Sequence, residues 1–364
     1  MKTVWVYSIL VASLVATACS AGAPATPTPV AASTSTGPAV PVPTATSRLG
    51  VRILVTITDR CCLNYIPALV GARVGAFEQN GLDVNWIPQV PGAAASMAAT
   101  LSGQADVTLI SAPGAVAAAG AGRPARIFSV ETFDAWPGMA VQPEIAAKLA
   151  TQGVTPKSSW KEKLRALAGL RVFSSSAGGP AEIRLRKMFA GAGLDPNGVV
   201  YQPGEPEAAN AAWRSKQLDT FTCCEPVTFQ LVPDAVVWLQ PEEVDLPLGG
   251  YAEIFATTDQ FAQANPEALR RVINTQKHMK QMILAAGPGS KEREAILTAL
   301  TAQYPTIPPD LIAKSFDTGR QEFDIDNEAT RKTAQDTIDS YNGGATVKVN
   351  ITPDRLIAPG FLKD

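Results

Sequence analysis

Strand-like and helix-like segments alternate along most of this 364-residue chain, and that alternation constrains its fold more than any other feature. β-branched, apolar runs predict the strands, and apolar residues at helical spacing predict the helices. Alternation of this kind predicts a mainly parallel sheet with helices on both faces, whose ligands bind beyond the carboxyl ends of the strands. In the first round we expect strands at 51–57, 82–87, 106–110 and 125–130 and helices at 66–79, 93–101 and 113–119.

A second round begins after residues 133–138, where the chain crosses to another lobe. Here we expect strands at 139–142, 170–174, 198–202, 219–222, 235–238 and 251–257 and helices near 160–167, 180–192, 206–216 and 226–232. Later helices are expected at 266–285, 290–303, 309–317 and 329–340. The predicted class is therefore α/β, with two lobes and a ligand cleft between them.

These segments give the expected domain organisation. It comprises a signal peptide at 1–19, a Pro/Thr/Ala-rich tether at 20–48, the first part of lobe one at 49–132, lobe two at 133–257, and a helical return onto lobe one at 258–364. The tether has frequent prolines and no charge over 20–47, so it cannot build a core and favours extended conformations.

The first nineteen residues have the pattern of an export signal. A short positive start precedes an apolar run, Val4 to Ala18, that is too short for a comfortable membrane span. Small residues then precede Cys19, which resembles the lipobox of bacterial lipoproteins. The resemblance implies lipidation of Cys19 and anchoring at the outer face of the bacterial cytoplasmic membrane. Ordinary cleavage near Ala21 or Ala23 is the alternative.

Composition argues against several functions. The chain has 31 Lys and Arg against 33 Asp and Glu, and no basic block, so we expect no nucleic-acid partner. Its single histidine, His278, excludes a poly-histidine metal site and discourages histidine-dependent catalysis. His278 belongs to a predicted helix far from the cleft loops, where we expect it to be solvated.

Several fragments in order resemble one family. They are Ala68–Val84, with its Phe77 and Gly-Leu-Asp-Val turn, then Leu101–Val107, Leu167–Val172, Ala192–Pro196, Leu218-Asp219 and Glu225-Pro226. This series is similar to the solute-binding proteins of ABC importers that take alkanesulfonates, taurine, nitrate or thiamine pyrimidines, a group related to a yeast pyrimidine synthase. The resemblance implies a type II periplasmic-binding-protein fold. It also implies a monomer without a cofactor or a catalytic step, with a small-molecule solute, a membrane permease and its ATPase as partners.

Three loops supply candidate ligand contacts. The loop after the first strand carries Asp59, Asn64 and Tyr65, and in relatives such a segment grips the solute; alternatively, Tyr65 packs under the loop and Asp59 pairs locally. The strand-to-helix turn at 174–180 offers hydroxyls and backbone N–H groups to a polar or anionic head, or is a plain turn. Its candidate residues are Ser174, Ser175, Ser176 and Gly178, and the equivalent first-lobe turn contributes Ser111.

The remaining cysteines form two adjacent pairs, Cys61-Cys62 and Cys223-Cys224, on loops expected to face the cleft from opposite lobes. An oxidising compartment favours disulfides, four thiolates would suit a soft metal or a metal-bearing cofactor, and buried thiols can pack as small apolar groups. The sequence leaves all three open. Glu225, beside the second pair, either contacts ligand or caps the next helix.

We therefore expect an importer component that captures a thiamine-pyrimidine precursor or a sulfonate-like anion by hinge closure. Three alternatives remain: a thiol-dependent binder of a soft metal or cofactor, an enzyme of the pyrimidine-synthase or thiol-redox type, and a ligand sensor. A pyrimidine synthase of that type would need a histidine in the pocket, and His278 is not placed there.

Overall fold

The computed structural model describes residues 48–55, 63–87, 90, 92–133, 138–174, 177–204, 206–222 and 235–364. The expected leader, Cys19 and nearly all of the expected tether lie outside the described residues, as does the helix expected at 226–232.

The first lobe is built on a five-stranded sheet in the order β2-β1-β3-β10-β4. Its strands are β1 (Leu49–Val55), β2 (Leu82–Ile87), β3 (Val107–Ser111), β4 (Ala125–Phe133) and β10 (Tyr251–Thr258). β1 pairs in parallel with β2 and β3, while β10 runs antiparallel between β3 and β4. The carboxyl ends of β1, β2 and β3 therefore share one edge of the sheet.

The second lobe repeats this plan in the order β7-β6-β8-β5-β9. Its strands are β5 (Met139–Val141), β6 (Arg171–Ser174), β7 (Val200–Pro203), β8 (Thr220–Phe221) and β9 (Val236–Leu239). β6 pairs in parallel with β7 and β8, and β5 runs antiparallel between β8 and β9. Each sheet thus has a single antiparallel strand among its described strands, and the expected mainly parallel, two-lobed α/β class is confirmed.

One strand belongs to a different lobe from the one we expected. Residues 251–257 were placed with the second lobe, but β10 lies inside the first sheet. The physical reason is a return crossing: after β9 the chain comes back through residues 244–250 and inserts β10 between β3 and β4. β10 is buried along nearly its whole length, as a central strand should be.

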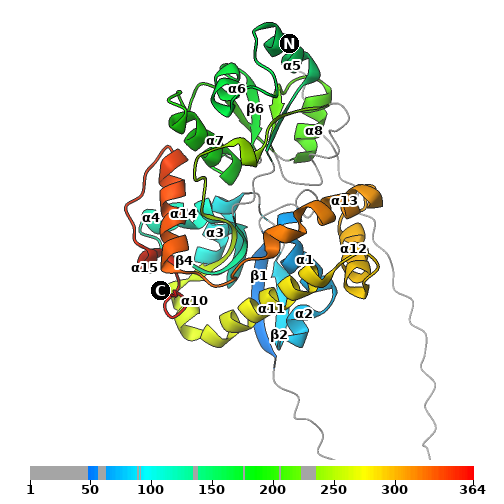
Figure 1. Cartoon of the computed structure of the whole chain (residues 1–364). Coiled ribbons are helices and arrows are strands. Elements are labelled where there is room, and N and C mark those ends of the chain that lie inside the picture. The colour runs from blue at the N-terminus through cyan, green and yellow to red at the C-terminus, as the bar shows by residue number, and fades with distance from the viewer. Residues whose placement is uncertain are drawn as a thin grey trace, which may run out of the picture. The chain divides into compact units, whose positions relative to one another are not determined.

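Helices cover both faces of the first sheet (Figure 1). One face carries α1 (Ile66–Arg73), α2 (Ala76–Gln79) and α11 (Pro266–Ala285), and beyond them α12 (Lys291–Gln303) and α13 (Pro309–Gly319). The other carries α3 (Ala93–Leu101), α4 (Ala112–Gly120), α14 (Arg331–Gly344) and α15 (Pro353–Leu356). Short helices complete this lobe: η1 (Leu63–Tyr65), α10 (Asp259–Ala264) and η3 (Arg320–Phe323).

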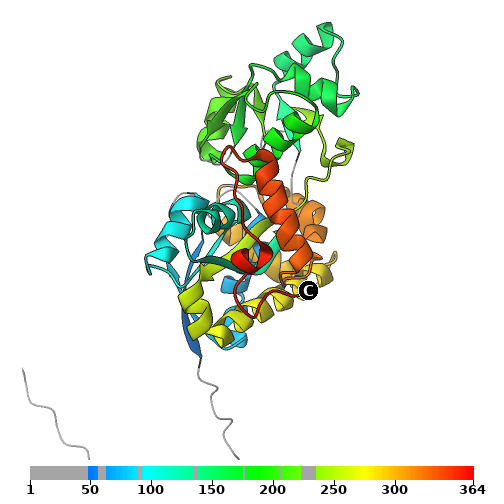
Figure 2. The same cartoon turned by 90° about the vertical axis from the view of Figure 1, so that its left-hand side faces the viewer.

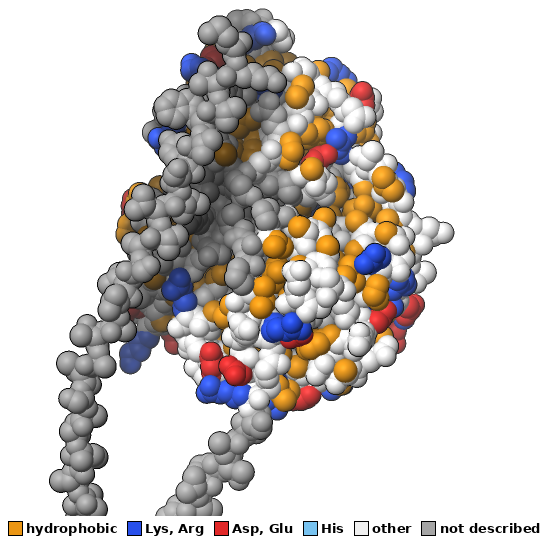
Figure 3. All heavy atoms as spheres, turned by 180° about the vertical axis from the view of Figure 1, so that it is seen from behind, with side chains coloured by type: hydrophobic (Ala, Val, Ile, Leu, Met, Phe, Trp, Pro, Cys, Tyr) orange, Lys and Arg blue, Asp and Glu red, His pale blue; other side chains and the backbone are white. Residues whose placement is uncertain are grey.

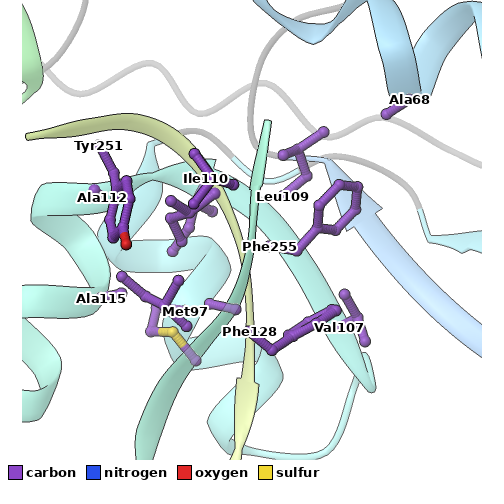
Figure 4. Packing of buried hydrophobic residues seen from close by; sticks show 14 of the residues in the cluster. Ala68, Met97, Val107, Leu109, Ile110, Ala112, Ala115, Phe128, Tyr251 and Phe255 are labelled. Atoms are coloured by element: carbon purple, nitrogen blue, oxygen red, sulfur yellow. The ribbon is translucent and has the colours of Figure 1, made fainter. Parts of the chain in front are cut away.

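The core of the first lobe forms between these layers. Phe128 and Phe255 lie side by side on neighbouring strands with ring centroids 6.0 Å apart. Figure 4 shows Phe255 beside Leu109, and Met97 of α3 beside Ala115. A second cluster joins α1, α11, α12 and α13. Burial of these side chains, at about 25 cal/mol per Å² of apolar surface, is the main force holding the helices to the sheet.

The second lobe has its own core around Trp238 and Phe189. Its helices are α5 (Pro143–Thr151), α6 (Trp160–Ala166), α7 (Pro180–Gly191), α8 (Pro206–Arg214) and the short η2 (Pro241–Glu243). Ser159 and Glu162 form a capping box that fixes the start of α6.

Helix α14 packs against both lobes, on α7 of the second and on α4 and β10 of the first (Figure 2). Gly344 permits the contact with α7, because a Cβ there would lie 1.9 Å from the carbonyl oxygen of Ile183. The same helix holds the return crossing: Ser340 Oγ donates to Leu248 O at 2.7 Å, and Thr337 Oγ1 accepts from Tyr251 N at 2.9 Å. α14 is therefore the element that connects the lobes beside the return crossing.

The structure also differs from the expected helices. The helix expected over 66–79 is interrupted at Gly75, whose φ of +73° lies in the left-handed region that favours glycine. α5, α10 and α15 were not expected. Among the described helices, none combines the length and apolar character of a membrane span. Hydrophobic side chains on the face seen in Figure 3 are scattered among polar ones.

Candidate functional site

A cavity of about 560 Å³ lies where the two lobes meet. From the first lobe it is lined by the first turns of α3 and α4, and from the second by residues 177–179 and 203–204. Tyr341 of α14 completes the described lining. We call this space the interlobe cavity.

Its position follows from the topology of the sheets. α3 and α4 begin just after β2 and β3, and residues 177–179 and 203–204 follow β6 and β7. β2 and β3 each pair in parallel with β1, and β6 pairs in parallel with β7, so the carboxyl ends of these strands open toward the cavity. This is where α/β sheets place their ligands.

Three helix N-termini contribute to the lining of the cavity. The cavity is lined by Ala93, Ala94 and Ala95 in the first turn of α3, by Gly114 in α4, and by Gly179 at the start of α7. None of these three helices has a side-chain hydrogen bond at its N-cap. The first N–H groups of a helix lack partners within the helix and carry a partial positive charge, so together they suit an acceptor or an anion.

Small residues bring two of these helix starts together. A Cβ added to Gly114 would lie 2.7 Å from the Cβ of Ala93, closer than real Cβ atoms approach. Glycine at this position therefore lets the first turns of α3 and α4 converge on the same space.

No charged side chain is among the described residues that line the interlobe cavity. Its polar side chains there are the hydroxyls of Ser111 and Tyr341. Burial raises the pKa of Tyr341, so its hydroxyl keeps its proton and can donate a hydrogen bond. Near α7 the Glu182 carboxylate accepts from Gly178 N at 3.0 Å and is paired with Arg186 at 2.8 Å, which offsets its negative charge.

A pair of buried carboxyl groups lies in the first lobe beside η1. Glu253 on β10 is 4% exposed and accepts a hydrogen bond from the hydroxyl of Tyr65. Glu131 on β4 is 1% exposed and accepts from Ala68 N, in the first turn of α1, at 2.9 Å. The other oxygen of Glu131 has no hydrogen-bond partner among the described residues.

Burial perturbs both carboxyl groups. It raises the pKa of Glu253 to about 8, against the opposing effects of the Tyr65 hydroxyl and the charge of Arg184. Burial also raises the pKa of Glu131 well above its ordinary value; the Ala68 N–H opposes this, and the nearby Glu253 adds to it. Because Arg184 belongs to α7, a positive charge of the second lobe acts on the Glu253 carboxyl group of the first lobe.

The predicted site residues fall into three groups. Ser111 and Gly178 line the interlobe cavity. Asn64 is half-buried in η1, Tyr65 is 1% exposed within the core, and Ser174 is 1% exposed at the end of β6. The others lie outside the described residues and stay predictions: Asp59, Cys61, Cys62, Ser175, Ser176, Cys223, Cys224 and Glu225.

Sequence reasoning missed the first turn of α3, Tyr341 and the two buried glutamates. The glutamates had a detectable signal, since each is the single acid of its strand. Tyr341 gave no such signal in the sequence, because α14 follows the other segments of the cavity by more than 130 residues. His278 is exposed on α11, as expected, with its Nδ1 3.5 Å from Asn80 Nδ2.

Metal binding by the chain's thiols is not tested by the described residues. Within them, no three His, Cys, Asp or Glu side chains are grouped as metal ligands. The four thiols proposed as soft ligands lie outside the described ranges.

Comparisons with known proteins define the class of this fold. A structure from Bordetella bronchiseptica RB50 has 18% sequence identity and a TM-score of 0.68, covering 86% of this chain and 95% of its own. The periplasmic aliphatic sulphonate-binding protein SsuA of Escherichia coli has 15% identity and a TM-score of 0.62, with 85% and 98% covered. The periplasmic nitrate-binding protein NrtA of Synechocystis PCC 6803 has 14% identity and a TM-score of 0.57, with 74% and 70% covered.

The fold is therefore that of the two-lobed periplasmic binding proteins, as expected. Residues 60–297 match the NMT1-like family, and the chain belongs to that family. No curated protein matches the chain by sequence.

Proposed function

We propose that the protein is the exported solute-binding component of an ABC importer, and that it captures a small organic oxyanion in the interlobe cavity. One observation carries the proposal: three uncapped helix N-termini and two hydroxyls surround a cavity whose described lining has no charged side chain. N–H groups and helix dipoles stabilise negative charge without a cationic side chain.

Two further observations support the role. The chain belongs to the NMT1-like family, and its fold is shared with proteins whose names describe sulphonate and nitrate binding. The lining comes from both lobes, so a bound solute contacts both at once and favours the closed arrangement. Binding without a chemical step is sufficient for this task.

Delivery needs partners that follow from the same role. We propose a membrane permease with its ATPase as the receiving complex, and lipidation at Cys19 as the means of holding the protein beside it. The protein acts as a monomer in this scheme.

Calorimetric titration tests the solute class. An alkanesulfonate, nitrate and a hydroxymethyl aminopyrimidine are added separately to the purified protein, and we expect saturable binding of the sulfonate. If only the pyrimidine binds, the proposed solute is a thiamine precursor and not an oxyanion. If none of the three binds, with or without a reductant that keeps the cysteines as thiols, the importer proposal for these solutes fails.

Tyr341→Phe locates the binding in the interlobe cavity. Loss of one hydrogen bond costs about 0.5–1.5 kcal/mol, so we expect roughly a two- to tenfold weaker Kd with unchanged stoichiometry. Tyr201→Phe is the matched control, since that hydroxyl donates to Pro196 O at 3.1 Å and is not part of the cavity. Equal affinities for wild type and Tyr341→Phe would place the solute elsewhere.

A further inference from the structure

A second cavity, of about 250 Å³, lies in the first lobe between α11 and the C-terminal segment. It shares no lining residue with the interlobe cavity. Three cationic side chains and one carboxylate line it: Arg270, Lys277, Lys363 and Glu328. The cations outnumber the carboxylate, so the cavity carries a net positive charge. We call it the basic cavity.

Glu328 fixes two of the cations in place. Lys277 Nζ and Lys363 Nζ both donate to its carboxylate, the second at 2.5 Å. Burial opposes the charge of Glu328, but these two hydrogen bonds outweigh it and lower its pKa. An ammonium group has three N–H donors, so each lysine keeps donors for a second acceptor.

Arg270 is held in a different way. Its guanidinium lies over the ring of Phe361, 5.8 Å from the centroid. Phe361 is 8% exposed and packs edge-on against Phe128 of the core at 6.2 Å. The neighbouring Arg271 pairs with Glu267, but within the described residues Arg270 has no carboxylate partner. Its five N–H donors are therefore free of a competing charge.

Backbone hydrogen bonds fix the wall that carries Phe361 and Lys363. Ala358 N donates to Ile127 O at 2.8 Å, and Lys363 N donates to Ala329 O at 2.9 Å. The segment between them is thus attached to the fold at both ends. The basic cavity is preformed, and binding there needs little ordering of the chain.

We propose that the basic cavity is an oxyanion-binding site that takes a phosphate-like group, from free phosphate or from a phospholipid headgroup. A guanidinium and two ammonium groups around one space form the charge-assisted hydrogen bonds that such a group requires. The amide of Asn274 adds a neutral donor on the same wall. Glu328 limits affinity while it holds the lysines apart.

Calorimetric titration of inorganic phosphate into the purified protein, at ionic strength held constant with chloride, tests this site. We expect weak, saturable binding that Arg270→Gln and Lys277→Gln each weaken roughly ten- to a hundredfold, since a hydrogen bond to a charged group contributes about 1.5–3 kcal/mol. Lys332→Gln is the matched control: Lys332 pairs with Asp336 on the exposed side of α14, and its replacement removes the same charge from a residue that does not line the basic cavity.

Glycerophosphoglycerol, the headgroup of phosphatidylglycerol without its acyl chains, distinguishes the two sources. Tighter binding of this diester than of phosphate assigns the site to lipid headgroups, and the reverse assigns it to free phosphate. The proposal is overturned if Arg270→Gln and Lys277→Gln bind both anions as tightly as wild type does. It is also overturned if Lys332→Gln loses as much affinity. Solute binding in the interlobe cavity should be unchanged in Arg270→Gln, so failure here is distinct from failure of the importer role.

Discussion

An arginine–aspartate fork of the same form joins two adjacent parallel strands in each lobe. Arg52 of β1 donates its backbone N and Nε to Asp106 Oδ2 at 2.8 and 3.1 Å. Arg171 of β6 donates the same two atoms to Asp219 Oδ2 at 2.8 and 2.9 Å. Each aspartate immediately precedes the neighbouring parallel strand, β3 or β8. One carboxylate therefore joins the beginning of β3 or β8 to the parallel strand beside it.

Asp219→Asn should destabilise the second lobe. The Asp219 carboxylate accepts hydrogen bonds from the backbone and from two guanidinium nitrogens of Arg171, and an amide cannot accept all of them. Because the pair is partly exposed, we expect a loss of only about 1–2 kcal/mol, measured by urea unfolding. Asp83→Asn, at an exposed position on β2, is the control.

The same pair gives an acid-side pH dependence. The hydrogen bond from Arg171 lowers the pKa of Asp219 below its ordinary value. Its contribution is therefore present above the unfolded-state pKa and is lost as pH falls through the folded pKa. The difference between wild type and Asp219→Asn should shrink between pH 6 and about pH 3, and a constant difference would contradict the assignment.

Glu253 predicts the opposite dependence. Burial raises its pKa to about 8, so the folded protein binds a proton that the unfolded chain releases. The stability from this proton is fully present below about pH 4 and is lost as pH rises through about 8. Between pH 5 and 9 the Glu253 group should lower the unfolding free energy by on the order of 4 kcal/mol. Glu253→Gln should remove this part of the pH dependence. Exposed Glu294 supplies the control, Glu294→Gln, and an unchanged slope in Glu253→Gln would refute the assignment.

Residue-scale features were only partly accessible from the sequence. Asp106 and Asp219 both lay in the fragments that suggested the family, but nothing local to them indicated their arginine partners 54 and 48 positions earlier. The turns at Ser111 and Gly178 were predicted from strand ends, because parallel strands deliver such turns to one edge. Tyr341 reaches the same cavity only through the tertiary packing of α14.

At the scale of elements, Gly344→Ala tests the packing of α14 on α7. The new Cβ would lie 1.9 Å from a backbone oxygen of Ile183, which no side-chain rotation relieves. We expect a loss of about 1–3 kcal/mol in thermal or urea unfolding. Gly319→Ala in α13 is the matched control, since nothing lies within 4 Å of its added Cβ and stability should hold or rise slightly. Equal stability of the two variants would show that α14 moves away from α7 freely.

Periodicity predicted most elements within a few residues, including α3 and α11 with the bounds observed. Its main error concerned β10, whose apolar pattern is that of any buried strand and carries no information about which sheet it joins. Gly75 was a local signal that the expectation of one continuous helix overlooked. Sheet membership depends on long-range crossings, which a local pattern cannot encode.

At the scale of the whole molecule, solute binding should bring the lobes together. Contacts from both lobes to one solute exist together only when the interlobe cavity is closed around it. Small-angle scattering at saturating solute should therefore give a smaller radius of gyration than the solute-free protein. An unchanged radius, with binding verified by calorimetry on the same sample, would mean that the lobes are already closed without solute.

The two-lobed class was predictable because strand–helix alternation occurs twice with a crossing between the rounds. The solute was not, because recognition through helix N-termini uses backbone groups that every residue type supplies. A sequence reveals the chemistry of side chains, and few side chains in the described lining of this cavity carry polar groups.

The arginine–aspartate forks lie where β3 and β8 begin, toward the edge of each sheet opposite the interlobe cavity. Each lobe is thus stiffened at the end that lies far from the cavity, so it should move as a rigid body. A small displacement at the cavity should then be transmitted undiminished to the outer surface of the lobe. A membrane partner could detect an occupied protein from the tilt of these surfaces, without any contact with the solute.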